Sequence, residues 1–309
     1  MADTAEEKKI VGLSCGRPNG NCETLLRAAA MAAEEYGVKT EIIRATELDI
    51  RRCRGCDSCL NAYFEGKSAK CPVKDDVAWV LDKTVAEDCA LILSIPVFYL
   101  RSNALFMCIT ERLHGLMFGS NLKILEKKNV GAIISVGGGP PDWTPLALVT
   151  ANIFLQHHRI LVDQMQVNRV PVVLNEQNLE RAKRLGANVA RAMQLPPEEV
   201  RYLGDDTPVS CPVCHCNVLV VPEELPTVYC PVCWVRGKIV LRDGRMEVSW
   251  NPEDVREPRF SLEGVRRHLA DIARWRTEVV RPQVGKVKEI ARQFEGFGAL
   301  VSPPHEPSR

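Results

Sequence analysis

Between residues 9 and 195, short runs rich in β-branched residues alternate with segments of helical periodicity. The runs "KIVGLS", "CALILSIPVF" and "NVGAIISVGGG" are apolar almost throughout, as strands are when both faces of their sheet are covered. Segments such as "CETLLRAAAMAAEEYG" lie between them and have the length of a crossover helix. This alternation predicts an α/β fold with a parallel sheet flanked by helices, in which ligands bind at the carboxyl ends of the strands.

Three loops with glycine or aromatic residues are expected at those ends. The first, "SCGRPNGNCETLL", opens a helix, so Ser14, Arg17 and the backbone N–H groups can hold a phosphate. The second, "SIPVFYLRSNALFM", offers aromatic rings to a flat ligand, and the third, "SVGGGPPDWTP", brings glycines close to it. Any one of them could be a plain turn, but three at one edge favour a cofactor. Because no G-x-G-x-x-G follows the first strand, a mononucleotide fits better than a dinucleotide.

A second feature is a group of four cysteines in the segment "CRGCDSCLNAYFEGKSAKC". Cys53, Cys56 and Cys59 follow the spacing C-x2-C-x2-C, and Cys71 comes later. Zinc knuckles take their second cysteine pair from elsewhere, whereas three closely spaced thiolates with one further cysteine are typical of 4Fe-4S sites. The spacing predicts a 4Fe-4S cluster in the loop 53–71, and a reduced or zinc-loaded loop is the alternative. Cys89 or water is a substitute ligand if Cys71 does not bind.

A metal site of a different kind is predicted beyond a polar, proline-rich linker that begins near residue 196. Two C-P-V-C knuckles, Cys211 with Cys214 and Cys230 with Cys233, give a four-thiolate site. His215 and Trp234 follow the knuckles where rubredoxin has glycine, which favours zinc over a rubredoxin-like iron centre. The segment "RDGR" predicts a hairpin.

Composition and charge exclude several classes of protein. With 46% apolar residues, a chain of 309 residues can bury a full core, and 40 basic against 39 acidic residues give no attraction to nucleic acid or to a membrane surface. The N-terminus lacks a secretory pattern and no run is long enough for a membrane helix, so we expect a cytoplasmic protein. In a reducing compartment its 13 cysteines are metal ligands or buried thiols rather than disulfides.

We expect three parts in the chain. Residues 1–195 form the sheet domain with the loop 53–71, and residues 196–260 form a zinc-ribbon or rubredoxin-like module. Residues 261–309 form a terminal helix, with helical periodicity over 262–294, and a disordered "SPPHEPSR" tail.

The part from residue 9 to 195 resembles the NADPH-dependent FMN reductase branch of flavodoxin-like proteins and, within it, the iron-sulfur flavoproteins of anaerobes. "SCGRPNGNCETLL" is similar to the FMN phosphate loop and "CRGCDSCLNAYFEGKSAKCPVKDDV" to the compact cluster motif with its trailing Asp75 and Asp76. "PVFYLRSNALFMCITERL" and "SVGGG" are similar to the two loops that hold the isoalloxazine ring. The chain departs from the family at Cys22, where Ser or Thr is usual, at Met107, and in the longer gap before Cys71.

The resemblance implies a flavodoxin-like, doubly wound parallel sheet that binds FMN. The cofactor-binding residues that it implies are Ser14, Arg17, Asn19, Gly20, Asn21, Cys22, Thr24, Pro96, Val97, Phe98, Tyr99, Ser102, Gly137, Gly138 and Gly139.

The combination of cofactors predicts an electron-transfer flavoprotein that couples a ferredoxin-type donor, or another redox protein, to a two-electron acceptor. No side chain is assigned a catalytic role. Arg101 and Arg112 could neutralise a flavin or substrate charge, although solvated surface arginines are commoner. An NAD(P)H-dependent FMN or quinone reductase with structural metal sites is one alternative, and a redox-responsive protein-binding module is another. We expect a homo-oligomer, either a dimer or a tetramer, and no nucleic-acid or membrane partner.

Overall fold

A computed structural model describes residues 8–127 and 129–295. The chain divides at Gly264 into two compact units. The first unit holds the sheet and the four-cysteine ribbon. The "SPPHEPSR" tail, predicted to be disordered, lies outside the described residues, and the division expected at residue 195 stays a prediction.

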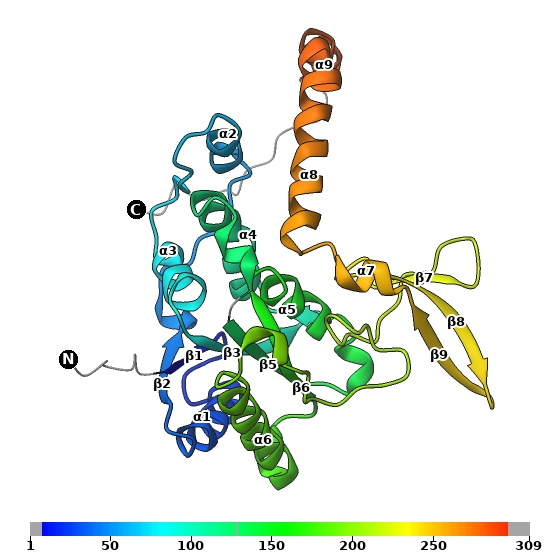
Figure 1. The fold of residues 1–309 in the computed structure, drawn as a ribbon. Helices are drawn as coiled ribbons and strands as arrows, with labels where there is room; N and C mark the ends of the chain where they lie inside the picture. Colours follow the sequence, from blue (N-terminus) through cyan, green and yellow to red (C-terminus); the bar gives the residue numbers. More distant parts are fainter. Residues whose placement is uncertain (1–7, 128, 296–309) are drawn as a thin grey trace. The chain divides into compact units, whose positions relative to one another are not determined.

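The central sheet is parallel, with the strand order β2-β1-β3-β5-β6 (Figure 1). Apart from the short β4, this is the order 2-1-3-4-5 of flavodoxin-like folds, so the predicted fold class is confirmed. β1, β3 and β5 are buried along almost their whole length, which explains their continuous apolar sequences. The strands are β1 (Lys9–Ser14), β2 (Lys39–Arg44), β3 (Ala90–Phe98), β4 (Arg101–Ser102), which pairs antiparallel with β3, β5 (Asn129–Gly137) and β6 (Arg159–Val167).

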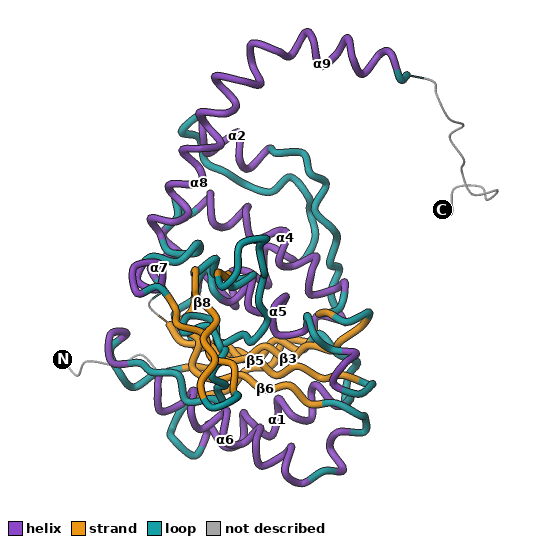
Figure 2. Tube along the Cα trace, turned by 90° about the vertical axis from the view of Figure 1, so that its right-hand side faces the viewer, coloured by secondary structure: helices purple, strands orange, loops and turns teal. Residues whose placement is uncertain are grey.

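Helices cover both faces of this sheet (Figure 2). On one face lie α1 (Asn21–Glu34) and α6 (Glu176–Ala192), which pack so closely that a Cβ on Gly186 would lie 1.9 Å from the carbonyl oxygen of Ala29. The other face is covered by α3 (Val77–Leu81), α4 (Ala104–Gly119) and α5 (Ala147–Leu155). The loop between β2 and α3 contains α2 (Ser58–Phe64), whose Tyr63 ring packs 5.1 Å from that of Phe118 on α4.

The ribbon follows α6 and forms a small antiparallel sheet of β7 (Thr227–Tyr229), β8 (Arg236–Arg242) and β9 (Arg245–Trp250). Asp243 and Gly244 both have positive φ and close the hairpin between β8 and β9, as the "RDGR" pattern predicts. The remaining helices are α7 (Pro252–Arg256), α8 (Leu262–Trp275) and α9 (Arg281–Gln293). Within the described ranges, none of the helices has both the length and the apolar character needed to cross a membrane.

Candidate cofactor and metal sites

The loop between β1 and α1 fits a phosphate. Ser14 Oγ is buried and has no hydrogen-bond partner among the described residues. Gly20 is the N-cap of α1 and no side chain caps the helix, so the N–H groups of its first turn are free to bind an anion. A Cβ on Gly16 would lie 2.8 Å from Cys22 Cβ, and one on Gly20 would lie 2.7 Å from Arg17 Cγ. The loop therefore needs glycine at both positions.

Sequence analysis did not identify Glu23, whose carboxylate is buried in the first turn of α1. It accepts hydrogen bonds from Asn19 N at 3.1 Å, Arg44 Nε at 3.0 Å and Arg27 Nε at 2.8 Å. The hydrogen bond from Arg44 is the main reason why the pKa of Glu23 falls to about 2. Two arginines offset this charge next to the phosphate loop, and the bond to Asn19 holds that residue at a φ of 55°.

The other predicted residues of this loop support its backbone. Thr24 Oγ1 donates to Gly20 O at 3.0 Å, and Ser94 Oγ on β3 donates to Cys22 O at 2.8 Å. Burial raises the pKa of Cys22 to about 12, so it is a neutral thiol. Arg17 and Asn19 are exposed and Asn21 is half-buried.

The two loops predicted to hold a flat ring carry exposed aromatic side chains. Phe98 is 62% exposed, Tyr99 is 97% exposed and Trp143 is 63% exposed. Pro96 is half-buried and Val97 is buried, so they belong to the end of β3. Large rings left open at the carboxyl edge of a parallel sheet are the surroundings expected for a planar ligand.

Side chains tie these loops to one another. Ser102 is buried and its hydroxyl donates to Ala147 O at 3.3 Å, so it fixes the start of α5. Asn103 donates from Nδ2 to Cys15 O at 3.0 Å and accepts at Oδ1 from Phe106 N, so it links the first loop to α4.

The three glycines of the third loop differ in their surroundings. A Cβ on Gly137 would lie 2.4 Å from Thr144 Cγ2, and one on Gly139 would lie 3.2 Å from Trp143 Cβ. Gly138 is exposed, and the nearest atom to its Cβ position is 3.9 Å away. Gly138 is therefore the glycine of this loop with room for a ligand beside it.

The first group of cysteines belongs to the loop that follows β2 and packs along α4, where Cys71 lies against Gly115. Cys56 is exposed, and Cys53, Cys59 and Cys71 are half-buried. The pKa of Cys59 is raised by burial and, to a smaller degree, by the charges of Cys71 and Cys53. Ser58 Oγ donates to Cys56 Sγ at 3.3 Å, which lowers the pKa of Cys56. The thiolate form that binds iron is thus favoured at the exposed position.

The structure corrects two interpretations of the sequence near this loop. Arg112 is only 3% exposed and its guanidinium is paired with Asp75, so it is not a solvated surface arginine. Cys89 precedes β3 at the amino end of the sheet, whereas the loop 53–71 follows β2 at the carboxyl end. Cys89 is also buried, with its sulfur between Lys83 O at 3.4 Å and Arg159 Nη2 at 3.8 Å, so it is not presented to the loop as a ligand.

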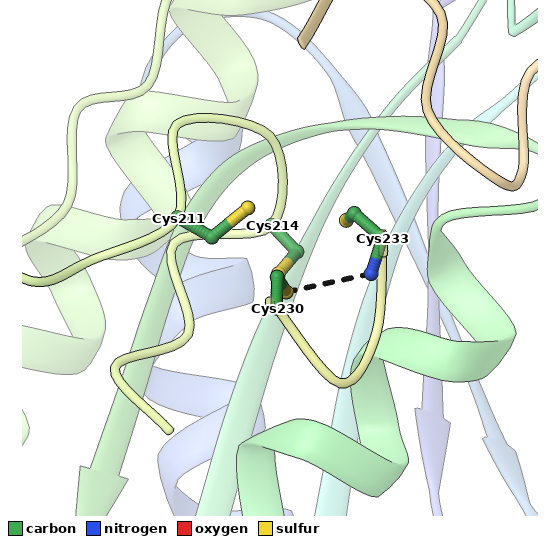
Figure 3. A group of neighbouring side chains, drawn as sticks. All are labelled: Cys211, Cys214, Cys230 and Cys233. Atoms are coloured by element: carbon green, nitrogen blue, oxygen red, sulfur yellow. Dashed lines mark hydrogen bonds between the residues drawn. The ribbon is translucent and has the colours of Figure 1, made fainter. Parts of the chain in front are cut away.

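Within residues 8–127 and 129–295, one set of ligand atoms is gathered closely enough to hold a single metal ion, and it is the ribbon set Cys211, Cys214, Cys230 and Cys233 (Figure 3). Their sulfurs lie within 4.8 Å of one another. A tetrahedral site with zinc–sulfur bonds has sulfurs ~3.8 Å apart, so the group is close to its metal-bound geometry. Hydrogen bonds from Cys211 and the other two thiols lower the pKa of Cys230.

The residues after the two knuckles have left-handed backbones although neither is glycine. His215 has a φ of 54° and Trp234 a φ of 59°. The ring of His215 stacks 3.5 Å from that of Tyr202, and Trp234 stacks 4.9 Å from Tyr229. Ring stacking thus stabilises a backbone conformation that glycine would adopt without strain.

The ribbon is docked on the sheet domain by amides. Gln164 of β6 donates from Nε2 to His215 O at 2.9 Å and to Cys214 O at 3.3 Å. Asn152 of α5 donates from Nδ2 to Cys216 Sγ at 3.4 Å, and Val149 belongs to the apolar cluster around the ribbon cysteines. Sequence analysis missed this interface, which places the four-cysteine site directly on α5 and β6.

A flavodoxin-like sheet with a phosphate loop after its first strand and exposed aromatic rings on later loops defines a flavin-dependent oxidoreductase. The chain belongs to the family described as NADPH-dependent FMN reductase, which it matches over residues 8–169. The family description names FMN, and the phosphate loop fits such a cofactor.

The relatives agree with this assignment. An iron-sulfur flavoprotein of Methanocaldococcus jannaschii is 29% identical over 200 residues, which cover 60% of this chain and 98% of the relative. An iron-sulfur flavoprotein of Methanosarcina thermophila is 30% identical over 155 residues, covering 50% of this chain and 76% of the relative. A solved structure of a flavone reductase has a TM-score of 0.76 at 23% identity and covers 96% of this chain and 99% of its own. It shows that the fold is shared beyond the sheet domain.

Proposed function

We propose that this protein transfers electrons between a ferredoxin-type donor and a two-electron acceptor through a 4Fe-4S cluster and FMN. The supporting observation is that its two cysteine groups differ in exposure. The loop group has one exposed and three half-buried cysteines, whereas every ribbon ligand is 2% exposed or less. Because electron transfer from another protein requires close approach, the loop is the group that an external donor can reach.

The segment that leads to this loop begins next to the proposed flavin site. Thr46 Oγ1, at the start of the segment that leads to Cys53, donates to Gly16 O in the phosphate loop at 3.3 Å. Both loops end neighbouring parallel strands, β2 and β1, so they emerge at the same sheet edge. A cluster supplies single electrons and a flavin accepts one or two, so this arrangement suits coupling between them. The chain would orient the two groups, and Phe98, Tyr99 and Trp143 would offer their open ring surfaces to the flavin.

For the ribbon we propose one structural zinc ion. A closed four-thiolate zinc site is redox-silent and stabilises the fold around it. The four-cysteine site is buried against α5 and β6, and this position is suited to a structural ion.

The test is anaerobic purification followed by iron, zinc, acid-labile sulfide and flavin analysis. We expect one FMN, one zinc and about four iron and four sulfide per chain, with visible absorbance that dithionite bleaches. Cys59→Ala should remove the sulfide but not FMN, because the phosphate loop is separate. Cys108→Ala, another half-buried cysteine outside both groups, is the matched control and should change neither. Full sulfide in Cys59→Ala would contradict the assignment of the loop.

A second candidate function is an NAD(P)H-dependent reductase of quinones or other flat organic substrates. It is favoured by the open rings of Phe98, Tyr99 and Trp143 and by the fold shared with a flavone reductase. Stopped-flow reduction of the bound flavin separates the two functions. Fast bleaching by NADPH or NADH would favour the reductase, and fast bleaching by reduced ferredoxin alone would favour electron transfer through the cluster.

We also propose a homo-oligomer, because Val170 and Leu174 beside the flavin loops are 47% and 82% exposed. Light scattering after gel filtration tests this, and a monomeric mass would contradict it.

A further inference from the structure

One face of α4 contacts the returning limb of the cluster loop. Arg112, Gly115 and Gly119 have the spacing i, i+3, i+7, which places them on one side of the helix. A Cβ on Gly119 would lie 2.7 Å from Ala69 O, and one on Gly115 would lie 3.2 Å from Cys71 Cβ. The limb therefore runs antiparallel along α4, with Cys71 against the middle of this face.

At the end of this face, the Arg112 guanidinium holds both limbs of the loop. Nη1 donates to Arg51 O at 3.1 Å, on the limb that leads to Cys53. Nη2 donates to Val73 O at 3.2 Å, on the limb that leaves Cys71. Asp75 accepts from both nitrogens at 2.8 and 2.9 Å, and its carboxylate is fully buried. Bidentate pairing of this kind fixes the orientation of a guanidinium as well as its position.

These hydrogen bonds do not involve the third nitrogen of the guanidinium, Nε. Arg112 Nε is buried and has no hydrogen-bond partner among the described residues, and a buried donor without an acceptor is costly. Burial acts to lower the pKa of Arg112, but Asp75 and the nearby Cys71 sulfur outweigh it and raise that pKa. Cys71 packs on Gly115, one helical turn from Arg112 on the same face of α4, so its sulfur is the acceptor that the fold brings beside this unpaired N–H.

We propose that Arg112 is a positioning residue for the iron-sulfur cluster. It fixes the two limbs of the loop at Arg51 and Val73 and donates its Nε–H to Cys71 Sγ when that sulfur is a thiolate ligand. The inference rests on the proposed function, since it requires a cluster in the loop 53–71. Asp75 already balances the guanidinium charge, so the effect on the cluster comes from the N–H···S bond and from the fixed loop. Hydrogen bonds to cluster sulfurs raise the reduction potential.

The experiment compares Arg112→Gln and Arg112→Lys with the wild-type chain. The readouts are iron and sulfide per chain, and the midpoint potential of the cluster from a redox titration followed by electron paramagnetic resonance. Loss of an outer-shell partner costs about tenfold or more in metal affinity, so Arg112→Gln should retain much less cluster than wild type. Any cluster that remains should have a more negative potential. Arg112→Lys keeps a cation opposite Asp75 but lacks Nε–H, and we expect the same direction of potential shift.

Arg181→Gln is the matched control. It breaks another arginine–aspartate pair with a buried carboxylate, in which the half-buried Arg181 donates from Nη1 to Asp163 Oδ2 on β6 at 3.0 Å. It should lower stability without changing sulfide or potential, so an effect shared by both arginines would indicate only general destabilisation and overturn the proposal. Wild-type sulfide and an unchanged potential in Arg112→Lys would also overturn it. If the wild-type chain itself bound no sulfide, the proposed function would fail, and this inference with it.

Discussion

Replacing Gly119 by alanine tests how closely the cluster loop approaches α4. The new Cβ would lie 2.7 Å from Ala69 O, and because that neighbour is backbone, the whole limb has to move. Alanine gains about 1 kcal/mol of helix propensity over glycine, whereas overpacking costs about 1–3 kcal/mol. We therefore expect Gly119→Ala to be destabilised by about 0–2 kcal/mol, the difference between these two terms.

Other helical glycines provide a graded series with the same chemical change. At Gly115 the contact is 3.2 Å to Cys71 Cβ, and a small shift relieves it, so the stability should hardly change. At Gly285 of α9 no atom of the described residues lies within 4 Å of the Cβ position, so alanine should not destabilise the chain. At Gly186 the contact is 1.9 Å to Ala29 O between two packed helices, and the loss should be the largest of the four.

The assay is urea unfolding of reduced, anaerobic protein, together with sulfide per chain. The stabilities should fall in the order Gly285→Ala, Gly115→Ala, Gly119→Ala, Gly186→Ala. Cluster content should fall in Gly119→Ala, because the limb that carries Cys71 is displaced, and stay unchanged in Gly285→Ala. If Gly119→Ala matched Gly285→Ala in both measurements, the loop would not pack on α4 as described.

Two further predictions concern the phosphate loop. The folded-state pKa of Glu23 is about 2, below its ordinary value of 4.5, so its stabilising contribution is complete above pH 4.5 and is lost as the pH falls towards 2. Glu23→Gln should therefore flatten the dependence of Tm on pH over this range, and an unchanged slope would contradict the buried pairing with Arg44. Asn21→Asp should weaken FMN binding, because a carboxylate in the first turn of α1 repels a phosphate held there. The measurement is the amount of flavin that stays bound to Asn21→Asp after gel filtration. If the variant retained as much flavin as the wild-type chain, this loop would not be the phosphate site.

The features that the sequence predicted correctly are those that leave a local pattern. Buried parallel strands require unbroken apolar runs, so "CALILSIPVF" identified β3, and the spacing C-P-V-C identified the four cysteines that the fold brings together. The hairpin at Asp243 and Gly244 was likewise evident from two residues that tolerate positive φ.

The features that the sequence did not predict join residues far apart in the chain. Arg112 and Asp75 are 37 positions apart, and Arg44 and Glu23 are 21 apart, so no window of sequence contains either pair. Cys89 was a plausible ligand only while its buried contacts with Lys83 and Arg159 were unknown. The amides that dock the ribbon are ordinary surface residue types, and only tertiary structure shows that Gln164 faces Cys214.

The docked ribbon leads to the last prediction, which concerns removal of its metal. A fragment spanning 208–250 should bind one zinc ion, since all four ligands lie within it, and should lose its structure with a strong chelator. It lacks Val149, which packs against the cysteines in the full chain, and it lacks Asn152 and Gln164, which donate to Cys216 Sγ and to Cys214 O.

We therefore expect the chelator to remove zinc much faster from the fragment than from the full chain. Equal rates would mean that docking on α5 and β6 contributes nothing to metal retention. The colour of the fragment decides the role of the ion, because a four-thiolate zinc site is colourless and redox-silent whereas an iron site is red. A red fragment would make the ribbon a third redox centre. Electrons would then have to pass between a buried site on α5 and the flavin loop that begins the same helix, instead of entering only at the exposed cysteine loop.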